Sequence, residues 1–334
     1  MLQYQVYDCA TAFASMLTSV GGEVVQIGPA SPDAQSLRWK KWSTTQGTLP
    51  HGAIMHFTCA GAMTGQGKTS DTHLALLMPW SEKEPHFFRG LEMSPNGAVL
   101  YGPSFEHVGK CLAENAFTIF LIEHQYAIER LSTLLGRDPL LGAKSSLMLE
   151  LMPETRRGLE DLVLQLEEQA RGEDMEAFSN DEVRISIENR LLSLIAEGIQ
   201  ENSLAVNPEL PRHEARTRMV MACWELSRQR EESNLTLNDL CMAAHASART
   251  LQYVFLEMTG VTPNSFLRSH RLLRARRMLL YGRVESVKEA AYSCGFREMG
   301  RFSARYRELF DCNPSETLAE RKILDPISLN SRTA

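Results

Sequence analysis

The chain has 334 residues, which is enough for two or three domains of ordinary size. Its composition, 43% hydrophobic and 7% aromatic, is that of a globular protein, and no apolar run approaches the roughly 20 residues of a membrane-spanning helix. The formal net charge of −6 argues against a nucleic-acid partner only if the acidic excess is spread evenly over the chain. The cysteines number seven and form no Cys-x-x-Cys pair, and the amino terminus lacks a basic region followed by an apolar one. We therefore expect reduced thiols, no export signal and a cytoplasmic chain.

Residues 1–125 are predicted to form a β-rich domain. A short helix is expected near residues 13–20, ended by Gly21 and Gly22. Beyond it, short apolar or alternating runs recur, separated by clusters of Gly, Pro, Asn and Ser. Many short strands at such spacing are typical of a β-sandwich or a small barrel. The runs lie at residues 23–27, 37–42, 54–58, 74–78, 86–89, 98–101 and 117–122, and one of the separating clusters lies at residues 61–70.

The histidines and large aromatic residues of this domain raise the question of a ligand site. No two histidines form His-x-His and no Glu follows at a suitable spacing, so we expect dispersed histidines and no metal or cofactor. The aromatic side chains could line a small-molecule pocket or belong to the core, and the pattern leaves both open. The histidines are His51, His56, His73, His86, His107 and His124, and the aromatic residues are Trp39, Trp42, Trp80, Phe87 and Phe88.

Residues 126–204 are predicted to be a helical segment. One helix is expected over residues 127–135, ended by Gly136, a second from Pro153 to Gly172, and a third over residues 181–200. Residues 205–212 contain two prolines and are predicted to be a linker. Residues 323–334 are predicted to be a frayed tail.

The charge is unevenly divided along the chain. Residues 212–322 hold 19 Lys or Arg against 13 Asp or Glu, a net charge of about +6. The remainder holds 16 basic and 28 acidic residues, a net charge of about −12. A basic carboxyl-terminal module on an acidic body suits a chain in which one end meets nucleic acid and the other does not.

Within residues 213–322, one sequence pattern occurs twice. Leu237 pairs with Val287 at an offset of about 50, and one residue is inserted near Arg297. Beyond that point the offset is about 51, and the pairs are Leu251 with Phe302, Phe255 with Tyr306, Pro263 with Pro314 and Leu267 with Leu318.

Each copy has the pattern of a helix-turn-helix, over residues 236–258 and 286–310, with a connecting helix over 263–281. A short apolar-periodic helix is followed by a small or glycine-containing turn, His245-Ala246 in one copy and Gly295-Phe296 in the other. A second helix then carries apolar residues three or four positions apart, which place one face inward. Thr236, three positions before Asp239, is expected to cap the first helix.

The other face of each second helix carries side chains that can contact nucleic acid. Arg can form two hydrogen bonds with guanine, Gln can do so with adenine, and Ser can contact either. The residues expected to contact bases are Arg249, Gln252, Tyr253, Met299, Arg301 and Ser303. Those expected to contact phosphates are Ser247, Arg297, Arg305 and Arg307.

This repeat resembles the DNA-binding domain of the AraC/XylS family of bacterial transcription regulators. The first copy has the family's Ser-x-x-x-Leu-Gln-x-x-Phe core and its Gly-x-x-Pro-x-x-Phe-Leu close. The second has the Gly-Phe turn and the Asn-Pro close, and Met299-Gly300 stand where polar residues are common in the family. The resemblance covers residues 213–320. The front of the chain is similar in layout to regulators of ethanolamine-type catabolic operons, without specific matching residues.

The resemblance implies an α+β protein, with a β-rich, cupin-like or sandwich regulatory domain over residues 1–125. A helical connecting segment carrying dimer contacts or plain packing contacts would follow over 126–204, and then an all-α DNA-binding domain over 213–322. It further implies a cytoplasmic non-enzyme, usually an activator, with double-stranded DNA, RNA polymerase, a small-molecule effector and a second copy as partners. Two alternatives stay open. One is a metal-dependent cupin-type enzyme fused to a DNA-binding module, and the other is a regulator controlled by a partner protein.

Overall fold

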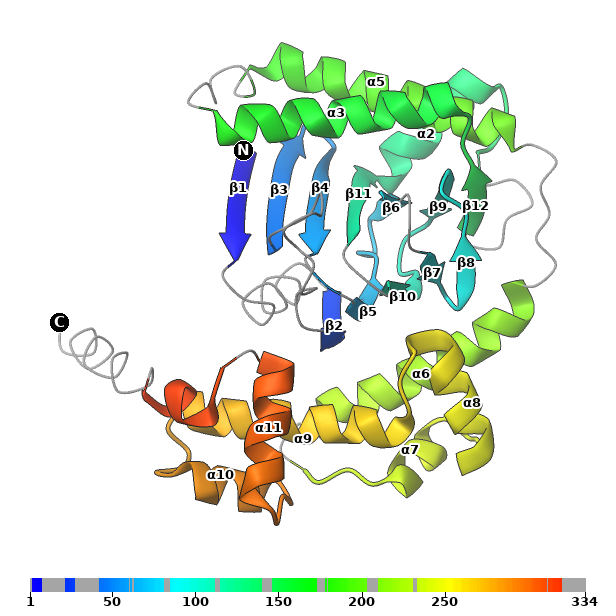
Figure 1. The fold of residues 1–334 in the computed structure, drawn as a ribbon. Helices are drawn as coiled ribbons and strands as arrows, with labels where there is room; N and C mark the ends of the chain where they lie inside the picture. The colour runs from blue at the N-terminus through cyan, green and yellow to red at the C-terminus, as the bar shows by residue number, and fades with distance from the viewer. Residues whose placement is uncertain are drawn as a thin grey trace.

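The computed structural model of the protein describes residues 2–7, 22–27, 42–59, 61, 63–80, 85–111, 115–139, 146–172, 178, 180–202, 210–230, 233–310 and 312–319. Two bodies are visible in Figure 1: a β-sandwich covered on one side by helices, and a helical domain below it. The short helix predicted near residues 13–20 and the tail at 323–334 lie outside the described residues.

The sandwich consists of two antiparallel sheets, as predicted for the front of the chain. The larger sheet has the strand order β1-β3-β4-β11-β6-β9-β12 and the smaller sheet has the order β2-β5-β10-β7-β8. The strands of the larger sheet are β1 Leu2–Tyr7, β3 Trp42–Leu49, β4 Gly52–Cys59, β11 Asn115–Glu123, β6 His73–Pro79, β9 Gly97–Tyr101 and β12 Ser146–Glu150. Those of the smaller sheet are β2 Gly22–Ile27, β5 Met63–Lys68, β10 Glu106–Cys111, β7 His86–Phe88 and β8 Leu91–Met93.

The central strands of the larger sheet are buried on both faces. Successive side chains of a strand point to opposite faces, so each strand contributes to two cores. On β9, Leu100 packs toward the helices, whereas Val99 and Tyr101 pack toward the smaller sheet. On β11, Phe120 packs toward the helices and Ile119 packs toward the smaller sheet. Burial on both faces explains why these strands read as continuous apolar runs.

Two strands contradict the sequence-based expectation. Residues 146–150 were expected to lie in a helical segment, but they form β12, which pairs with β9 through Leu149 opposite Ala98. Residues 63–68 lie in a stretch expected to be a turn, but they form β5 between β2 and β10. In both cases pairing with a distant strand supplies backbone hydrogen bonds that the local pattern does not indicate.

Three helices cover the outer face of the larger sheet, with α3 and α5 lying across the strands in Figure 1. They are α2 His124–Leu135, α3 Pro153–Arg171 and α5 Asp181–Glu201, close to the predicted bounds. Gly136 ends α2 in the left-handed region, at φ 67°. Leu159, Val163 and Leu166 of α3 pack against strand residues in the largest core of the molecule.

The helical domain has two separate cores, one for each copy of the repeat. Its helices are α6 Leu210–Gln229, α7 Leu237–Ala243, α8 Ala248–Thr259, α9 Pro263–Leu280, α10 Val287–Ser293 and α11 Met299–Phe310. Trp224, Leu251 and Phe255 belong to the core of the first copy. Phe302 and Tyr306 belong to that of the second. Helix α6 begins at Leu210, inside the segment expected to be a linker.

Thr236 caps α7 as expected. Its hydroxyl accepts a hydrogen bond from the Asp239 backbone N–H, and the Asp239 carboxylate accepts one from the Thr236 backbone N–H at 2.8 Å. The hydrogen bonds from Thr236 lower the pKa of Asp239. We expect Thr236→Ala to lower the free energy of unfolding of this domain by about 1 kcal/mol, as measured by denaturant titration. Thr236→Ser keeps the hydroxyl and should lie close to the wild type. Equal losses in both variants would show that the cap contributes nothing.

Candidate nucleic-acid interface

Both helix-turn-helix units turn at equivalent residues in the left-handed region. His245 has φ 48° and Gly295 has φ 80°, and the two positions correspond in the repeat. Positive φ is accessible to glycine without a steric penalty, and histidine adopts it less readily. The second turn is therefore evident from its glycine, whereas the first can be recognised only by its correspondence with the second.

The outward face of α8 carries the three residues expected to contact bases in the first unit. Arg249, Gln252 and Tyr253 are all exposed, and the Arg249 guanidinium lies 6.0 Å from the centre of the Tyr253 ring. Leu251 and Phe255 point the other way, into the core. Thr250 and Leu256 are also exposed on α8, and the sequence analysis did not single them out.

The residues expected to contact bases from α11 differ in their exposure, unlike those on α8. Arg301 is 82% exposed and pairs with Glu298 at 3.1 Å. Ser303 is half-buried, and Met299 packs partly against the core of the second unit. A Cβ at Gly300 would meet nothing within 4 Å, so the helix is bare at that position. Arg301 corresponds to Thr250 in the repeat, and the two units therefore present their arginines at different positions along the helix.

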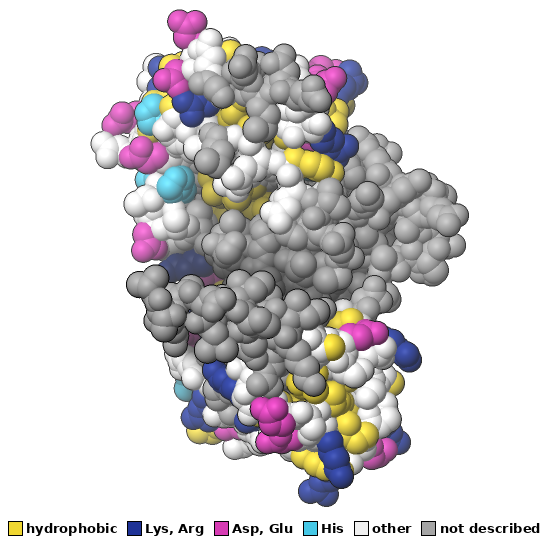
Figure 2. All heavy atoms as spheres, turned by 90° about the vertical axis from the view of Figure 1, so that its left-hand side faces the viewer, with side chains coloured by type: hydrophobic (Ala, Val, Ile, Leu, Met, Phe, Trp, Pro, Cys, Tyr) yellow, Lys and Arg dark blue, Asp and Glu magenta, His cyan; other side chains and the backbone are white. Residues whose placement is uncertain are grey.

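The residues expected to contact phosphates lie at the surface around these helices. Ser247 caps α8 by accepting a hydrogen bond from the Thr250 backbone N–H at 3.1 Å. Arg297 and Arg307 are exposed, and Arg305 pairs with Glu308 at 2.8 Å. An exposed ion pair contributes only about 0–1 kcal/mol, so a phosphate can replace the glutamate at little cost. Figure 2 shows basic and acidic side chains together on this domain.

Helix α9 joins the two units: in Figure 1, α11 crosses it and α8 lies beside its right-hand end. Its arginines hold the domain together. The Arg271 guanidinium lies 5.6 Å from the centre of the Phe296 ring, and that of Arg276 lies 4.8 Å from the Phe310 ring. Arg274 donates a hydrogen bond to the Asn234 side chain at 3.0 Å. The first two contacts join α9 to the second unit, and the third joins it to the segment before α7 in the first unit.

Comparison with known proteins agrees with this geometry. Residues 240–320 match a family described as a helix-turn-helix domain. The chain is 39% identical over 97 residues to the XylDLEGF operon transcriptional activator 1 of Pseudomonas putida, a match that covers 28% of this chain and 29% of that protein. It is 30% identical over 164 residues to the HTH-type transcriptional activator RhaS of Enterobacter sp. (strain 638), covering 48% and 54%.

The carboxyl-terminal domain belongs to the AraC/XylS family. A solved structure of a probable AraC family transcriptional regulator from Rhodopseudomonas palustris CGA009 is 31% identical. The match covers 31% of this chain and 96% of the chain of that regulator, with a TM-score of 0.29. The chain spans about a third of the length of the Pseudomonas putida activator and about half of that of RhaS.

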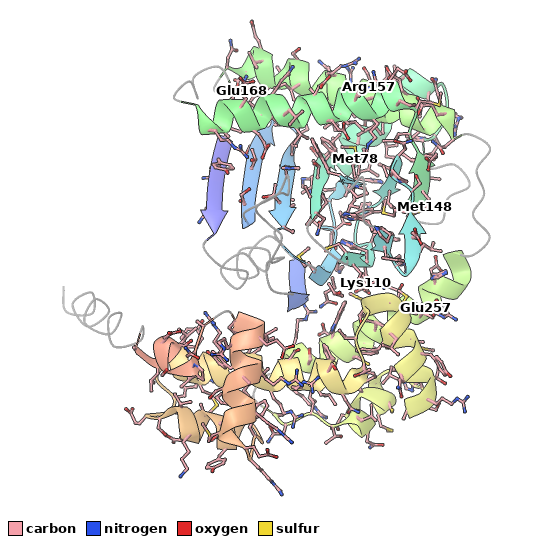
Figure 3. The ribbon with its side chains drawn as sticks, viewed as in Figure 1. Met78, Lys110, Met148, Arg157, Glu168 and Glu257 are labelled. Atoms are coloured by element: carbon pink, nitrogen blue, oxygen red, sulfur yellow. The ribbon has the colours of Figure 1, made fainter. Side chains whose placement is uncertain are left out.

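The β-sandwich packs directly against the AraC/XylS-type domain through β10. Val108 belongs to the core of the first helix-turn-helix. Lys110 donates a hydrogen bond to the Glu257 carbonyl oxygen at 3.4 Å, and Thr64 of β5 donates one to the Thr259 carbonyl oxygen at 2.9 Å. Figure 3 shows Lys110 at the edge of the sandwich that faces Glu257. These bonds hold the carboxyl end of α8 and leave the face that carries Arg249, Gln252 and Tyr253 exposed.

A second contact to the AraC/XylS-type domain comes from the turn after β7. The Arg89 Nε donates a hydrogen bond to the Thr217 hydroxyl at 3.1 Å, and His213 Nδ1 lies 3.0 Å from the Arg89 carbonyl oxygen. Gly90 has φ 79°, and a Cβ there would lie 2.7 Å from the Met258 sulfur. The close approach of the turn to α8 therefore requires glycine at this position.

A cavity of about 210 Å³ lies between the two sheets of the sandwich. Some of the aromatic residues line this cavity and others belong to the core. Phe87 and Phe88 are among the lining residues. Trp80 belongs to the core, and its indole N–H donates a hydrogen bond to the Thr118 hydroxyl at 2.8 Å. Trp39 and the side chain of Trp42 lie outside the described residues. The apolar lining consists of Met55, Phe57, Met63, Ala75, Leu77, Phe88, Met93, Phe117, Ile119 and Leu121, with Tyr101 beside them.

Two of the six histidines meet at this cavity, which the sequence did not predict. The pairing of β10 with β7 places His107 and His86 along its lining. Burial is the main cause that lowers the pKa of each to about 4, assisted by Arg89 near His107 and by Arg156 near His86. No group of three or more His, Cys, Asp or Glu side chains in the described part of the chain could hold a metal ion.

Among the described helices, none is both long and apolar enough to cross a membrane. The six cysteines that the structure describes are free thiols. Burial raises the pKa of the Cys111 thiol at the cavity to about 12.

Proposed function

We propose that the protein is a sequence-specific, double-stranded DNA-binding transcription regulator that acts in the cytoplasm. The observation that supports this most strongly is the tandem pair of helix-turn-helix units in an AraC/XylS-type domain, each with an exposed polar recognition helix. Helices α8 and α11 would enter successive major-groove segments about 10 base pairs apart, since that is one turn of the duplex. As both similar proteins named above are called activators, we propose activation, with RNA polymerase as a partner.

We propose that Arg249, Gln252 and Tyr253 contact bases in one segment, and Arg301, Ser303 and Met299 in the other. Ser247, Arg297, Arg305 and Arg307 would contact phosphates, which fix the position of the protein on the duplex without selecting a sequence. The exposure of Arg249 and Arg301 supports their part in this assignment. Because Met299 and Ser303 are half-buried, we propose that the second unit contributes less to base recognition than the first.

We propose that the β-sandwich controls the DNA-binding domain in response to a small molecule bound in the cavity between its sheets. The support is the position of β10: His107, Gly109 and Cys111 line the cavity, whereas Val108 packs against the first helix-turn-helix. A ligand that shifts β10 would thus act on the end of α8. Such a ligand can change activity only if it binds the active and inactive arrangements with different affinities. Dimerisation through α2, α3 and α5 is a further proposal, checked by sedimentation of the full chain.

The base-reading assignment is tested by Arg249→Ala. We expect specific binding to weaken by roughly 1–3 kcal/mol and sequence preference to relax at one operator position, because a guanidinium that contacts a base edge is lost. The measurement is a binding selection on randomised operators followed by titration. Arg307→Ala is the matched control, since loss of a phosphate contact should weaken binding equally on all sequences and reduce the salt dependence. Unchanged preference in Arg249→Ala would remove this residue from the base-reading set.

A further inference from the structure

The cavity exists because the smaller sheet presents glycine where side chains would otherwise fill the space. Gly109 of β10 pairs with Gly65 of β5, and both line the cavity. A Cβ at Gly109 would meet no atom within 4 Å, although β10 is a central strand of its sheet. Glycine weakens a strand and contributes nothing to packing, and a strand glycine often marks a site that a ligand approaches closely. Gly109 therefore keeps open a space that any larger residue would occupy.

The size of this space limits its occupant. An apolar protein cavity of about 150 Å³ holds one benzene molecule. The cavity here measures about 210 Å³, which suits a single ring with a small substituent or an aliphatic chain of similar size. Its lining is mainly Met, Phe, Leu and Ile, so most of the ligand surface must be apolar.

The polar groups of the cavity are uncharged. His86 Nε2 and His107 Nδ1 are buried without a hydrogen-bond partner among the described residues. A neutral imidazole offers one donor and one acceptor, so these rings can meet a hydroxyl or a carbonyl group. The lining also includes the polar residues Thr69, Ser70, Tyr101 and Asn115, but most of its surface is apolar. A sugar would leave many of its hydroxyls against apolar side chains without hydrogen-bond partners.

The charged lining residues face away from this space. No acidic residue is found in the described lining, and its basic residues are Lys68 and Lys110. In the strand register Lys110 lies opposite Thr64, and both side chains bond to the end of α8 on the outer face of the sheet. Lys68 is 53% exposed and lies 3.8 Å from Asp71. A charged group placed among the apolar side chains and the two histidines would therefore be buried without a partner, which is strongly unfavourable.

We propose that the cavity between the sheets binds a compact, mainly apolar molecule that carries no net charge and one or two hydrogen-bonding groups, which meet His86 and His107. This inference rests on the proposed regulatory role of the sandwich, and it specifies the chemistry of the effector. It excludes sugars, carboxylates and amines as ligands of this cavity.

The test uses the full chain and three probes of matched size: benzyl alcohol, benzoate and benzylamine. We expect benzyl alcohol to raise the thermal midpoint by roughly 5–10 °C at saturating concentration, and the two charged probes to leave it unchanged. In titration calorimetry the neutral probe should bind at least about tenfold more tightly than benzoate. If benzoate or benzylamine binds as tightly as benzyl alcohol, or if benzyl alcohol does not bind, the proposal is wrong.

A graded series at Gly109 identifies the site. Gly109→Ala should weaken binding of benzyl alcohol and Gly109→Leu should abolish it. The thermal midpoint of Gly109→Ala without ligand should not fall, because the added Cβ enters open space. Lys68→Met is the control and should bind benzyl alcohol as the wild type does. Full binding by Gly109→Leu, or loss of binding in Lys68→Met, would overturn the assignment. Because binding is read without DNA, failure here is separable from a failure to bind an operator.

Discussion

Replacing Trp224 by alanine is expected to lower the free energy of unfolding of the first helix-turn-helix by roughly 3–5 kcal/mol. Trp224 is fully buried in the core to which α6, α7, α8 and the start of α9 contribute, with its ring centre 6.4 Å from that of Phe266 on α9. Removing the indole leaves a cavity that the surrounding helices cannot close, because each is also held by the chain on either side. The loss is a large part of the stability of an ordinary domain, which is about 5–15 kcal/mol.

The variant should also uncouple the sandwich from the DNA-binding domain. Val108 of β10 belongs to the same core as Trp224, so disorder in that core removes the surface on which β10 packs. Footprinting should show loss of the operator half bound by α8, and thermal unfolding should gain an early transition. Tyr281→Ala is the control, because that aromatic side chain is 71% exposed and its loss opens no cavity. A complete footprint together with an unchanged unfolding curve would contradict the assigned core.

Replacing Phe302 by alanine is expected to have an effect of similar size on the other half of the operator. Phe302 is fully buried in the second core, with ring centres 5.1 Å from Phe296 and 5.6 Å from Tyr306. Its loss should cost roughly 3–5 kcal/mol and displace α11, which carries Arg301. Because the two cores share no residue, α8 should keep its half of the footprint.

The contrast between the two core variants is the informative measurement. We expect Trp224→Ala and Phe302→Ala to remove opposite halves of one protected region, and specific affinity to fall steeply in both. The unfolding of each variant should be followed by circular dichroism, so that lost contacts are distinguished from lost folding. If either substitution removed the whole footprint while the other core stayed folded, the two units would not bind DNA as separate readers.

The sandwich contacts the first helix-turn-helix, and this contact bears on how a ligand would act on DNA binding. The contacts from β10 and from the turn after β7 reach α6 and the end of α8, whereas α10 and α11 lie away from β10. A ligand between the sheets would therefore act on the first unit more than on the second. The second unit would supply binding that does not depend on the ligand.

The sequence by itself determined the DNA-binding domain, because its signals are local. The cap at Thr236 and the glycine turn at Gly295 each depend on residues a few positions apart. Helical periodicity then assigns Phe255 and Tyr306 to the interior and Arg249 to the surface. The same reasoning located α2 from Gly136 and α3 from Pro153 and Gly172.

Only the tertiary structure decided the rest, because it depends on pairing between distant strands. Strand β12 has no local strand signal and is held by β9, and the glycine-containing β5 is a strand because β2 and β10 flank it. His86 and His107 are brought to one cavity by the register of β7 on β10, and Val108 reaches the first helix-turn-helix by that same register. Register between strands follows from which faces are buried, and that is a property of the assembled sandwich rather than of any short stretch of sequence.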